Sequence, residues 1–344
     1  MKTAYTFDDL QIVPIYSEVE SRRSCDISTQ VTVNYRLNLP IVSSPMDTVT
    51  DSAMAIALGK LGGLGVIHRF FDIESQVIEV TKTINGGISL VAAAIGVVGD
   101  YQERAKALTD AGAKILLIDV AHGNTKLVRD AITWCKSNLP DYVDIIAGSV
   151  ATAEGAYNLA TWGAAGIRVG LGNGSLCETR IRTGIGVPQV TAIIETLRGV
   201  GESGLDVPII ADGGIKTTGD VAKAISLGAD SVMLGSLLAG TRESPGIIER
   251  IGNWPNEQLF KKYRGSASSE TKVHHGMEDK NVEGNSKLIP YKGKVGRIIS
   301  DIADGVRSAM SYTNASTIND FMANSNHILI TQNGLVEAKP HLLL

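Results

Sequence analysis

The sequence predicts an α/β fold, a single (β/α)8 barrel, on the basis of three observations. Eight short apolar runs recur along the 344 residues, and amphipathic stretches lie between them. Glycine or polar residues follow most of these runs directly. Runs that are apolar on both faces are typical of buried parallel strands, and eight strand–helix units fill about 250 residues.

The expected strands are four to seven residues long. They are Ile41–Ser44, Leu64–Ile67, Val91–Val97, Ile115–Asp119, Asp144–Ala147, Gly166–Val169, Val207–Ala211 and Ser231–Leu234. The clearest amphipathic stretches predict helices at Tyr101–Ala111, Thr125–Ser137, Ala153–Gly163, Val190–Val200 and Thr218–Leu227.

Two segments are longer than the strand–helix repeat requires. Most strand starts lie 22 to 29 residues apart, but 41 residues separate Gly166 from Val207, which predicts an active-site loop after the sixth strand. Residues 254–293, after the eighth strand, are polar and poor in β-branched runs, which predicts a structureless, mobile flap. Both follow strands, and barrel active sites lie at the carboxyl ends of strands. The alternative for each segment is a surface loop without function.

Composition excludes several classes of protein. The chain is 44% hydrophobic and 20% charged, with a net charge of −4, which argues against a nucleic-acid partner and against disorder. It has no run of 18 apolar residues and no apolar signal segment near Met1, so no membrane association is expected. Three cysteines without metal-ligand spacing indicate a reducing compartment, taken as cytoplasmic, and no zinc site.

The loop after the sixth expected strand contains the strongest candidate nucleophile. Gly170, Gly172 and Gly174 stand at alternate positions before Cys177, and Thr179 follows. Glycine lets the main chain approach a ligand closely, which a cysteine that attacks a bound substrate requires. The other two cysteines, Cys25 and Cys135, are interpreted as packing or surface thiols.

Other strand ends carry candidate binding groups. Asp212–Gly214 and Gly235–Ser236 follow the seventh and eighth strands, where many barrels bind phosphate through main-chain N–H groups. His68 is either a general base or a histidine held by local hydrogen bonds. Asp119 either orients a ligand hydroxyl or holds the next loop. The pair His274–His275 is expected to be solvated.

The segment from Gly172 to Arg180 resembles the signature of IMP dehydrogenases and GMP reductases. The segments 6–9, 44–50, 147–152, 210–215 and 232–236 are similar to the same family, so the resemblance extends over nearly the whole chain. It implies a barrel, usually a homotetramer, that acts at C2 of a purine nucleotide with a nicotinamide cofactor.

The resemblance also implies roles for individual residues. Cys177 would form a covalent adduct with purine C2, while Thr179 and the flap residue Glu283 move protons. The nucleotide would be bound by Ser44, Met46, Ser175, Asp212, Gly213, Gly214, Gly235, Ser236, Gly265 and Ser266. Asp119, Val120 and Ala121 would line the cofactor side, and the carbonyls of Gly172, Gly174 and Cys177 would surround a potassium ion.

Three features favour the GMP reductase branch, which uses NADPH. The short connection after His68–Phe70 leaves no room for the paired, CBS-type regulatory domain of most dehydrogenases. No arginine occurs between Gly265 and Gly293, whereas the resemblance assigns dehydrogenases a flap arginine that activates water. Residues 264–268 and 280–284 resemble a bacterial reductase flap.

Two alternatives remain open. Residues 7–9, 48–50 and 305–308 fit an NAD-dependent IMP dehydrogenase at least as well. A catalytically silent purine-binding barrel is the third reading. Glu178 departs from both branches, because it puts a carboxylate next to the thiol, where it would tend to raise the pKa of Cys177 unless it is compensated.

Overall fold

The computed structural model describes residues 2–253, 255–276, 278 and 280–338. It confirms the predicted barrel. Eight parallel strands close in the order β10-β11-β4-β5-β6-β7-β8-β9. The strands are β4 (Ile41–Ser43), β5 (Leu64–Ile67), β6 (Ala92–Ile95), β7 (Ile115–Ile118), β8 (Asp144–Val150), β9 (Gly166–Val169), β10 (Ile209–Asp212) and β11 (Ser231–Leu234).

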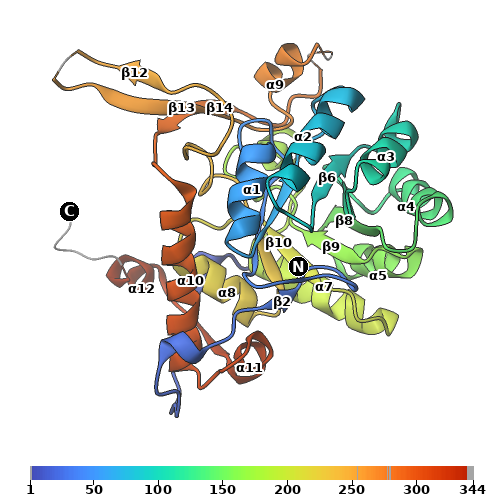
Figure 1. Ribbon diagram of the computed structural model, residues 1–344. Coiled ribbons are helices and arrows are strands. Elements are labelled where there is room, and N and C mark those ends of the chain that lie inside the picture. Colours follow the sequence, from blue (N-terminus) through green and yellow to red (C-terminus); the bar gives the residue numbers. More distant parts are fainter. Residues whose placement is uncertain (1, 254, 277, 279, 339–344) are drawn as a thin grey trace.

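Helices alternate with these strands and surround the barrel (Figure 1). They are α1 (Ser52–Lys60), α2 (Ile73–Asn85), α3 (Tyr101–Asp110), α4 (Lys126–Asn138), α5 (Ala153–Trp162), α7 (Gln189–Ser203), α8 (Thr218–Ser226) and α10 (Val295–Tyr312). Threonine or aspartate side chains cap many helix starts; Thr217, for example, forms a capping box with Asp220. None of the described helices is long and apolar enough to span a membrane.

Strand alternation divides the core into two parts. One set of side chains fills the barrel interior, and small residues such as Ala92 and Ala94 sit there beside Ile115, Ile146 and Ile210. The other set packs between the strands and the helices. This alternation also decides which residues at the carboxyl ends point into the barrel mouth.

Three strands, β5, β9 and β11, have the predicted bounds, and the other five differ from the prediction by one to three residues at one or both ends. The seventh strand begins at Ile209 rather than Val207, because Pro208 has no N–H to donate to a ladder. Its carbonyl still accepts from the Ile167 N–H. The fifth strand runs on to Val150 and carries a register shift between Ala147 and Val150.

The expectation that residues 254–293 lack secondary structure is wrong. Within the described residues, β13 (Gln258–Arg264) pairs with β12 (Glu249–Ile251) and β14 (Ser286–Pro290), and α9 (Ser269–His274) lies between β13 and β14. Figure 1 shows this sheet as an arm that extends away from the barrel. Burial alternates along Phe260–Arg264, where Lys261 and Tyr263 are the buried residues. The sequence of Gln258–Arg264 does not alternate between polar and apolar residues, because a lysine takes one of the buried positions, so no strand was expected there.

The remaining elements are short helices and strands outside the eight strand–helix units. They are η1 (Phe7–Asp9), β1 (Leu10–Val13), η2 (Arg22–Ser24), β2 (Thr29–Gln30), β3 (Arg36–Leu37), α6 (Thr179–Thr183), α11 (Ile318–Asn324), β15 (Asn326–Leu329) and α12 (Gln332–Glu337). β1 pairs with β15, so segments near the two ends of the chain lie side by side. Parts of the predicted domain and flap lie outside the described residues, namely Met1, Trp254, Met277, Asp279 and residues 339–344.

Candidate active site

A cavity of about 680 Å³ lies at the carboxyl ends of the barrel strands. All the residues predicted to act in catalysis or binding line it: Ser44, Met46, Asp119, Val120, Ala121, Gly172, Gly174, Ser175, Cys177, Thr179, Asp212, Gly213, Gly214, Gly235, Ser236, Gly265, Ser266 and Glu283. They come from five strand ends and from the segment after β13, so the fold brings together residues that are far apart in sequence.

Glycines fix the path of the loop that carries Cys177. Gly170 has φ +143°, and a Cβ placed there would lie 2.0 Å from the carbonyl oxygen of Asp212. The Gly174 carbonyl accepts a hydrogen bond of 3.1 Å from the Cys177 N–H. The loop therefore turns tightly against β10, and it leaves Cys177 half-buried at the cavity wall.

Cys177 begins a chain of hydrogen bonds. Its thiol donates to Thr179 Oγ1 at 3.2 Å, and the Thr179 hydroxyl donates to Glu283 Oε2 at 2.6 Å. Glu283 is 104 residues away from Thr179 in sequence. The arrangement joins a potential nucleophile, a hydroxyl and a carboxylate, which is a route for a proton.

Main-chain hydrogen bonds hold Glu283 in this position. The Glu178 N–H donates to the Glu283 carbonyl at 2.7 Å, and the Asn285 N–H donates to the Leu176 carbonyl at 3.0 Å. On the other side, the Glu283 N–H donates to the Ala267 carbonyl at 3.1 Å. Residues 283–285 thus lie between the Cys177 loop and residues 265–268.

The Glu178 carboxylate has its own partner. Its Oε2 lies 2.9 Å from Arg182 Nη2, one helical turn further along, and its Oε1 accepts from Asn285 Nδ2 at 3.4 Å. Arg182 compensates the negative charge that the sequence places beside the thiol.

The end of the cavity beside Ser175 and Met46 contains a residue that sequence reasoning missed. Tyr263 Oη lies 3.2 Å from Ser175 Oγ and 3.9 Å from Met46 Sδ. A Cβ on Gly235 would come within 3.0 Å of the same hydroxyl. Burial raises the pKa of Tyr263 to about 12, so its hydroxyl remains protonated and able to donate. Its place on β13 was hidden because no strand was predicted there.

Charged side chains line the floor of the cavity, and sequence reasoning missed two of them, Arg69 and Arg168. Asp119 accepts from Arg69 Nε at 3.3 Å and from Arg168 Nη1 at 2.8 Å. Arg168 Nε in turn donates to Asp212 Oδ2 at 2.7 Å. The four side chains form one ion-paired row across the barrel mouth. The alternation of β9 could have revealed Arg168, since Ile167 and Val169 face the helices.

The three histidines considered from the sequence, His68, His274 and His275, do not line this cavity. His68 is buried, its Nδ1 accepts from the Phe70 N–H at 3.2 Å, and its ring stacks on Phe71. Burial lowers the pKa of His68 to about 4. His274 is exposed as predicted, but the prediction that His275 is solvated is wrong: its Nε2 lies 2.9 Å from Asp47 Oδ2.

His275 and Arg264 attach the segment after β13 to the barrel. Arg264 Nη2 donates to the same Asp47 oxygen at 2.7 Å, and Asp47 is almost fully buried. The His275 ring also stacks on Phe70, with 5.3 Å between centroids, and Phe70 lines the cavity. The two remaining thiols, Cys25 and Cys135, are buried, which agrees with packing roles.

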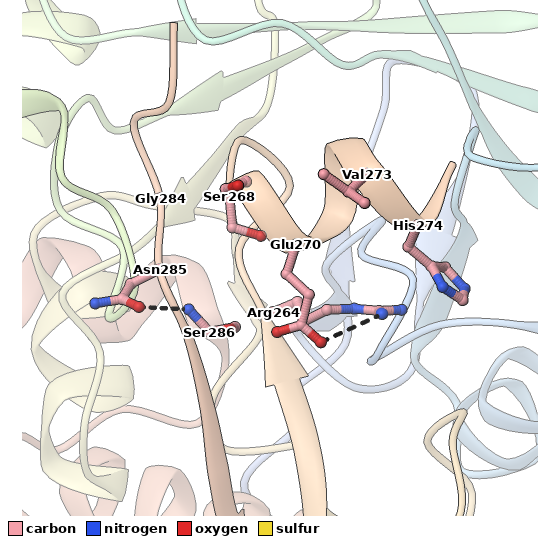
Figure 2. A pocket seen from close by; sticks show the side chains of 9 residues that line it. Arg264, Ser268, Glu270, Val273, His274, Gly284, Asn285 and Ser286 are labelled. Carbon is pink, nitrogen blue, oxygen red and sulfur yellow. Dashed lines mark hydrogen bonds and ion pairs between the residues drawn. The ribbon is translucent and has the colours of Figure 1, made fainter. Parts of the chain in front are cut away.

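A second cavity of about 470 Å³ lies beside α9 and β14 (Figure 2). Its wall includes Arg264 and Glu270, whose ion pair Figure 2 draws, and Gly284, which also lines the first cavity. Gly284 thus contributes to the walls of both cavities.

Residues 4–341 match the sequence model of the IMP dehydrogenase / GMP reductase domain. The chain belongs to the IMP dehydrogenase / GMP reductase family. Members of this family are oxidoreductases of purine metabolism that use nicotinamide cofactors. This confirms the family resemblance of the Cys177 segment.

Relatives from both branches of the IMP dehydrogenase / GMP reductase family are similar to the chain. It is 37% identical to the inosine-5'-monophosphate dehydrogenase of Cryptosporidium parvum, over 98% of this chain and 94% of the relative. It is 31% identical to the enzyme of that name from Nitrosopumilus maritimus, over 100% and 99%. A solved structure of a cysteine-to-alanine variant of GMP reductase from Trypanosoma brucei, in complex with guanosine 5'-monophosphate, superposes with a TM-score of 0.91 at 28% identity. That match covers 99% of this chain and 98% of the other.

Proposed function

We propose that this protein is an NADPH-dependent GMP reductase that converts GMP, NADPH and protons into IMP, ammonium and NADP. The observation that carries the proposal is the contact from Cys177 through Thr179 to Glu283, in a flap without an arginine from Gly265 to Gly293. The nearest arginine, Arg264, is held by Asp47. The GMP in the similar trypanosomal structure supports a purine nucleotide as substrate.

Attack on the nucleotide is the first step of the proposed reaction. The Cys177 thiolate forms a bond to C2 of the guanine ring, and Thr179 and Glu283 relay a proton to the 2-amino group. The C2–N bond then breaks, and ammonia leaves a thioimidate on Cys177. A nicotinamide cofactor, when bound, would supply the hydride that C2 accepts. The C2–S bond then breaks, which releases IMP and returns the Cys177 thiolate.

The cavity offers a binding group for each part of the nucleotide. The Asp212 carboxylate accepts from the ribose hydroxyls, and the main-chain N–H groups of Gly213, Gly235 and Ser236 donate to the phosphate. The Gly214 N–H donates to the Asn173 carbonyl instead, so Gly214 contributes the shape of the turn. Gly213 and Gly214 have φ of +95° and +77°, a turn in which a side chain would be strained. Tyr263 and Ser175 add two hydroxyls, and Met46 packs on the purine.

The cofactor side fits a flat ring and a ribose. Phe70 presents an aromatic surface braced by His275, and Asp119, Val120 and Ala121 form the adjacent wall. Each Asp119 oxygen accepts from one arginine. Since a carboxylate oxygen has two lone pairs, each keeps one for a ribose hydroxyl.

An IMP dehydrogenase that uses NAD is the second candidate. The observation that favours it is that the relatives at 31% and 37% identity are named inosine-5'-monophosphate dehydrogenases. Dehydrogenation needs an activated water to hydrolyse the thioimidate, and the flap of this chain lacks the arginine expected for that step.

One pair of assays distinguishes the two reactions. The purified protein is incubated with GMP and NADPH, and separately with IMP and NAD, while absorbance of the reduced nicotinamide is followed. NADPH consumption with GMP supports the reductase, and NADH formation with IMP alone would replace it by the dehydrogenase. Tight nucleotide binding without either reaction would indicate a silent nucleotide-binding barrel.

Four further properties are part of the proposal. The chain functions as one barrel domain, since β5 ends at Ile67 and α2 begins at Ile73 without an inserted regulatory domain. The described part of residues 254–293 acts as a mobile flap. The exposed Ile247, Ile248 and Ile251 near β12 fit an interface in a cytoplasmic homotetramer, which sedimentation would test.

A potassium ion at the Cys177 loop completes the proposal. The carbonyls of Gly172, Gly174 and Cys177 belong to one short loop, and the Gly174 oxygen keeps a second lone pair beside its hydrogen bond to Cys177. Such an ion would brace the loop without taking part in bond making. Nucleotide affinity and thermal stability in potassium and in lithium buffers test this.

A further inference from the structure

Arg168 occupies an unusual position for a charged residue. It lies on β9 with its side chain in the barrel interior, since its neighbours Ile167 and Val169 pack on the outer side. Its strand partner on β10 is Ile210, which belongs to the apolar filling of the barrel. The Arg168 side chain is 14% exposed and forms part of the cavity floor.

The barrel is built to accept this side chain. A Cβ on Gly148 of β8 would lie 2.6 Å from the Arg168 Cβ and 2.4 Å from the Arg168 carbonyl oxygen. Burial alone would lower the pKa of the Arg168 guanidinium, but the nearby carboxylates of Asp212 and Asp119 outweigh burial and raise it. Arg168 therefore remains a cation in the floor.

The two carboxylates that Arg168 binds stand on different strands. Asp119 follows β7 and Asp212 ends β10, and each bond to the guanidinium is shorter than 3 Å. Arg168 uses Nη1 for Asp119 and Nε for Asp212, so one rigid planar group fixes both carboxylates. Among the described residues, no side chain or N–H donates to Asp212 Oδ1, which leaves that oxygen for a ligand.

A buried row of charges is a poor device for stability. Removing ions from water is costly, and apolar residues of similar size often stabilise a core as well or better. Arg168 could have been an apolar residue like its interior neighbours Ile146 and Ile210. The retained charge and its two partners point to a role in the cavity above.

We propose that Arg168 is a positioning residue that couples the two ligand sites, because it orients Asp212 toward the nucleotide ribose and Asp119 toward the nicotinamide nucleotide at the same time. The inference rests on the proposed function only in assigning these two carboxylates to the two ligands. It holds for GMP with NADPH and for IMP with NAD alike. A nucleotide bound at Asp212 fixes the guanidinium plane, and this favours the Asp119 orientation that the second ligand needs.

The coupling is measured by calorimetry in a Cys177→Ala background, where no turnover consumes the ligands. The Kd of NADPH is determined with and without saturating GMP, and the ratio of the two values is the coupling factor. Coupling between sites is typically about 5- to 150-fold, and we expect at least about 5-fold here. Arg168→Met should reduce the coupling factor to about 1 and weaken the binding of each ligand by about 10-fold.

Arg168→Lys keeps a cation at this position, so it tests the inference even if Arg168→Met does not fold. A lysine carries one point charge, which can satisfy one carboxylate at a time. This variant should recover the affinity for one ligand to within about 3-fold of the parent, while the coupling factor stays near 1. Asp212→Asn should weaken GMP binding. Because Arg168 acts on GMP through Asp212, adding Arg168→Met should weaken GMP binding by no more than about twofold further.

Arg104 provides a matched control. It is a buried arginine, 8% exposed, that binds Asp100 and Gln76 outside the cavity. The coupling factor and the thermal stability are measured for both Arg104→Met and Arg168→Met. A coupling factor that survives in Arg168→Met, or that falls equally in Arg104→Met, would overturn the inference. If neither GMP nor IMP binds the parent protein, the proposed function fails instead.

Discussion

Two segments close the cavity, and they are built in different ways. The loop after β9 contains only the five-residue helix α6, and glycines hold its backbone against β10. The segment after β11 forms its own three-stranded sheet and the helix α9. The proposed nucleophile, Cys177, thus belongs to a loop of the barrel, whereas the carboxylate of Glu283 belongs to a segment with a sheet of its own.

This difference separates binding from proton transfer. The loop lies beside the turn at Gly213, where its Asn173 carbonyl accepts from the Gly214 N–H at 2.9 Å. The flap reaches the same place through main-chain bonds at residues 283–285 and through Asp47. Removal of the flap carboxylate Glu283 alone should therefore slow the chemistry while nucleotide binding persists.

Cys177→Ala tests the loop and should have the largest effect. Without the nucleophile, turnover should fall by roughly 10⁴-fold or more, the scale seen when a nucleophile is removed from a catalytic unit. Nucleotide affinity should stay within about 3-fold, because the hydroxyls and main-chain groups that bind the nucleotide remain. Steady-state rates and calorimetry measure the two quantities.

Cys135→Ala is the control for Cys177→Ala. Burial raises the pKa of Cys135 to about 12, so this thiol does not ionise near neutrality and should not react. Iodoacetamide should label Cys177 alone, and bound GMP should protect it. Turnover by Cys177→Ala at more than a hundredth of the parent rate would exclude covalent catalysis.

Glu283→Gln tests the flap and should have the second largest effect. The amide cannot take the proton from Thr179, so the chemical rate should fall by roughly 10²- to 10⁴-fold. Glu178→Gln is the matched control, since Glu178 stands beside the cysteine but binds Arg182. Its rate should stay within about 3-fold. Single-turnover measurements compare them, and equal losses in both variants would remove the special role of Glu283.

These two glutamates show what the sequence can and cannot predict. Apolar runs at regular intervals and glycine-rich strand ends predicted the barrel and the residues that surround its mouth, because each is a local pattern. The orientation of Glu178 away from the thiol depends on Arg182, one helical turn later. Family resemblance, not local pattern, pointed to Glu283, because only tertiary folding brings it to Thr179.

The same reasoning explains the missed residues. Tyr263 lies on a strand whose polar composition suggested a loop, so its hydroxyl was not expected at Ser175. Arg168 could have been predicted to face the barrel interior, yet its two partners follow other strands and depend on barrel closure. Spatial partners between distant segments are what the sequence alone does not supply.

Asp47→Asn tests how the flap is attached and should have a smaller effect. Asp47 is the shared partner of Arg264 and His275, and the loss of its charge weakens both contacts. We expect kcat to fall by about 10-fold, which corresponds to about 1.4 kcal/mol, and protease cleavage within residues 265–285 to accelerate. Asp130→Asn, which breaks an exposed pair with Lys126 on α4, should change neither quantity. Unchanged cleavage in Asp47→Asn would contradict this account of flap attachment.

His68→Asn should have the smallest effect on catalysis, because His68 belongs to the barrel wall rather than to either segment. The asparagine can still accept from the Phe70 N–H, so turnover should stay within about 3-fold. A loss of more than about 100-fold would instead identify His68 as a general base.

Acid stability gives His68→Asn a second readout. Burial lowers the pKa of His68 to about 4 in the folded protein, whereas an unfolded histidine titrates near 6.5. Below pH 6.5 the unfolded chain therefore binds a proton at His68 that the folded protein does not bind. The free energy of unfolding then falls as the pH falls toward 4. Between pH 7 and pH 5 this contribution is about 2 kcal/mol. Urea unfolding at the two pH values should show a pH-dependent loss that is smaller by about this amount in His68→Asn than in the parent, because asparagine does not titrate.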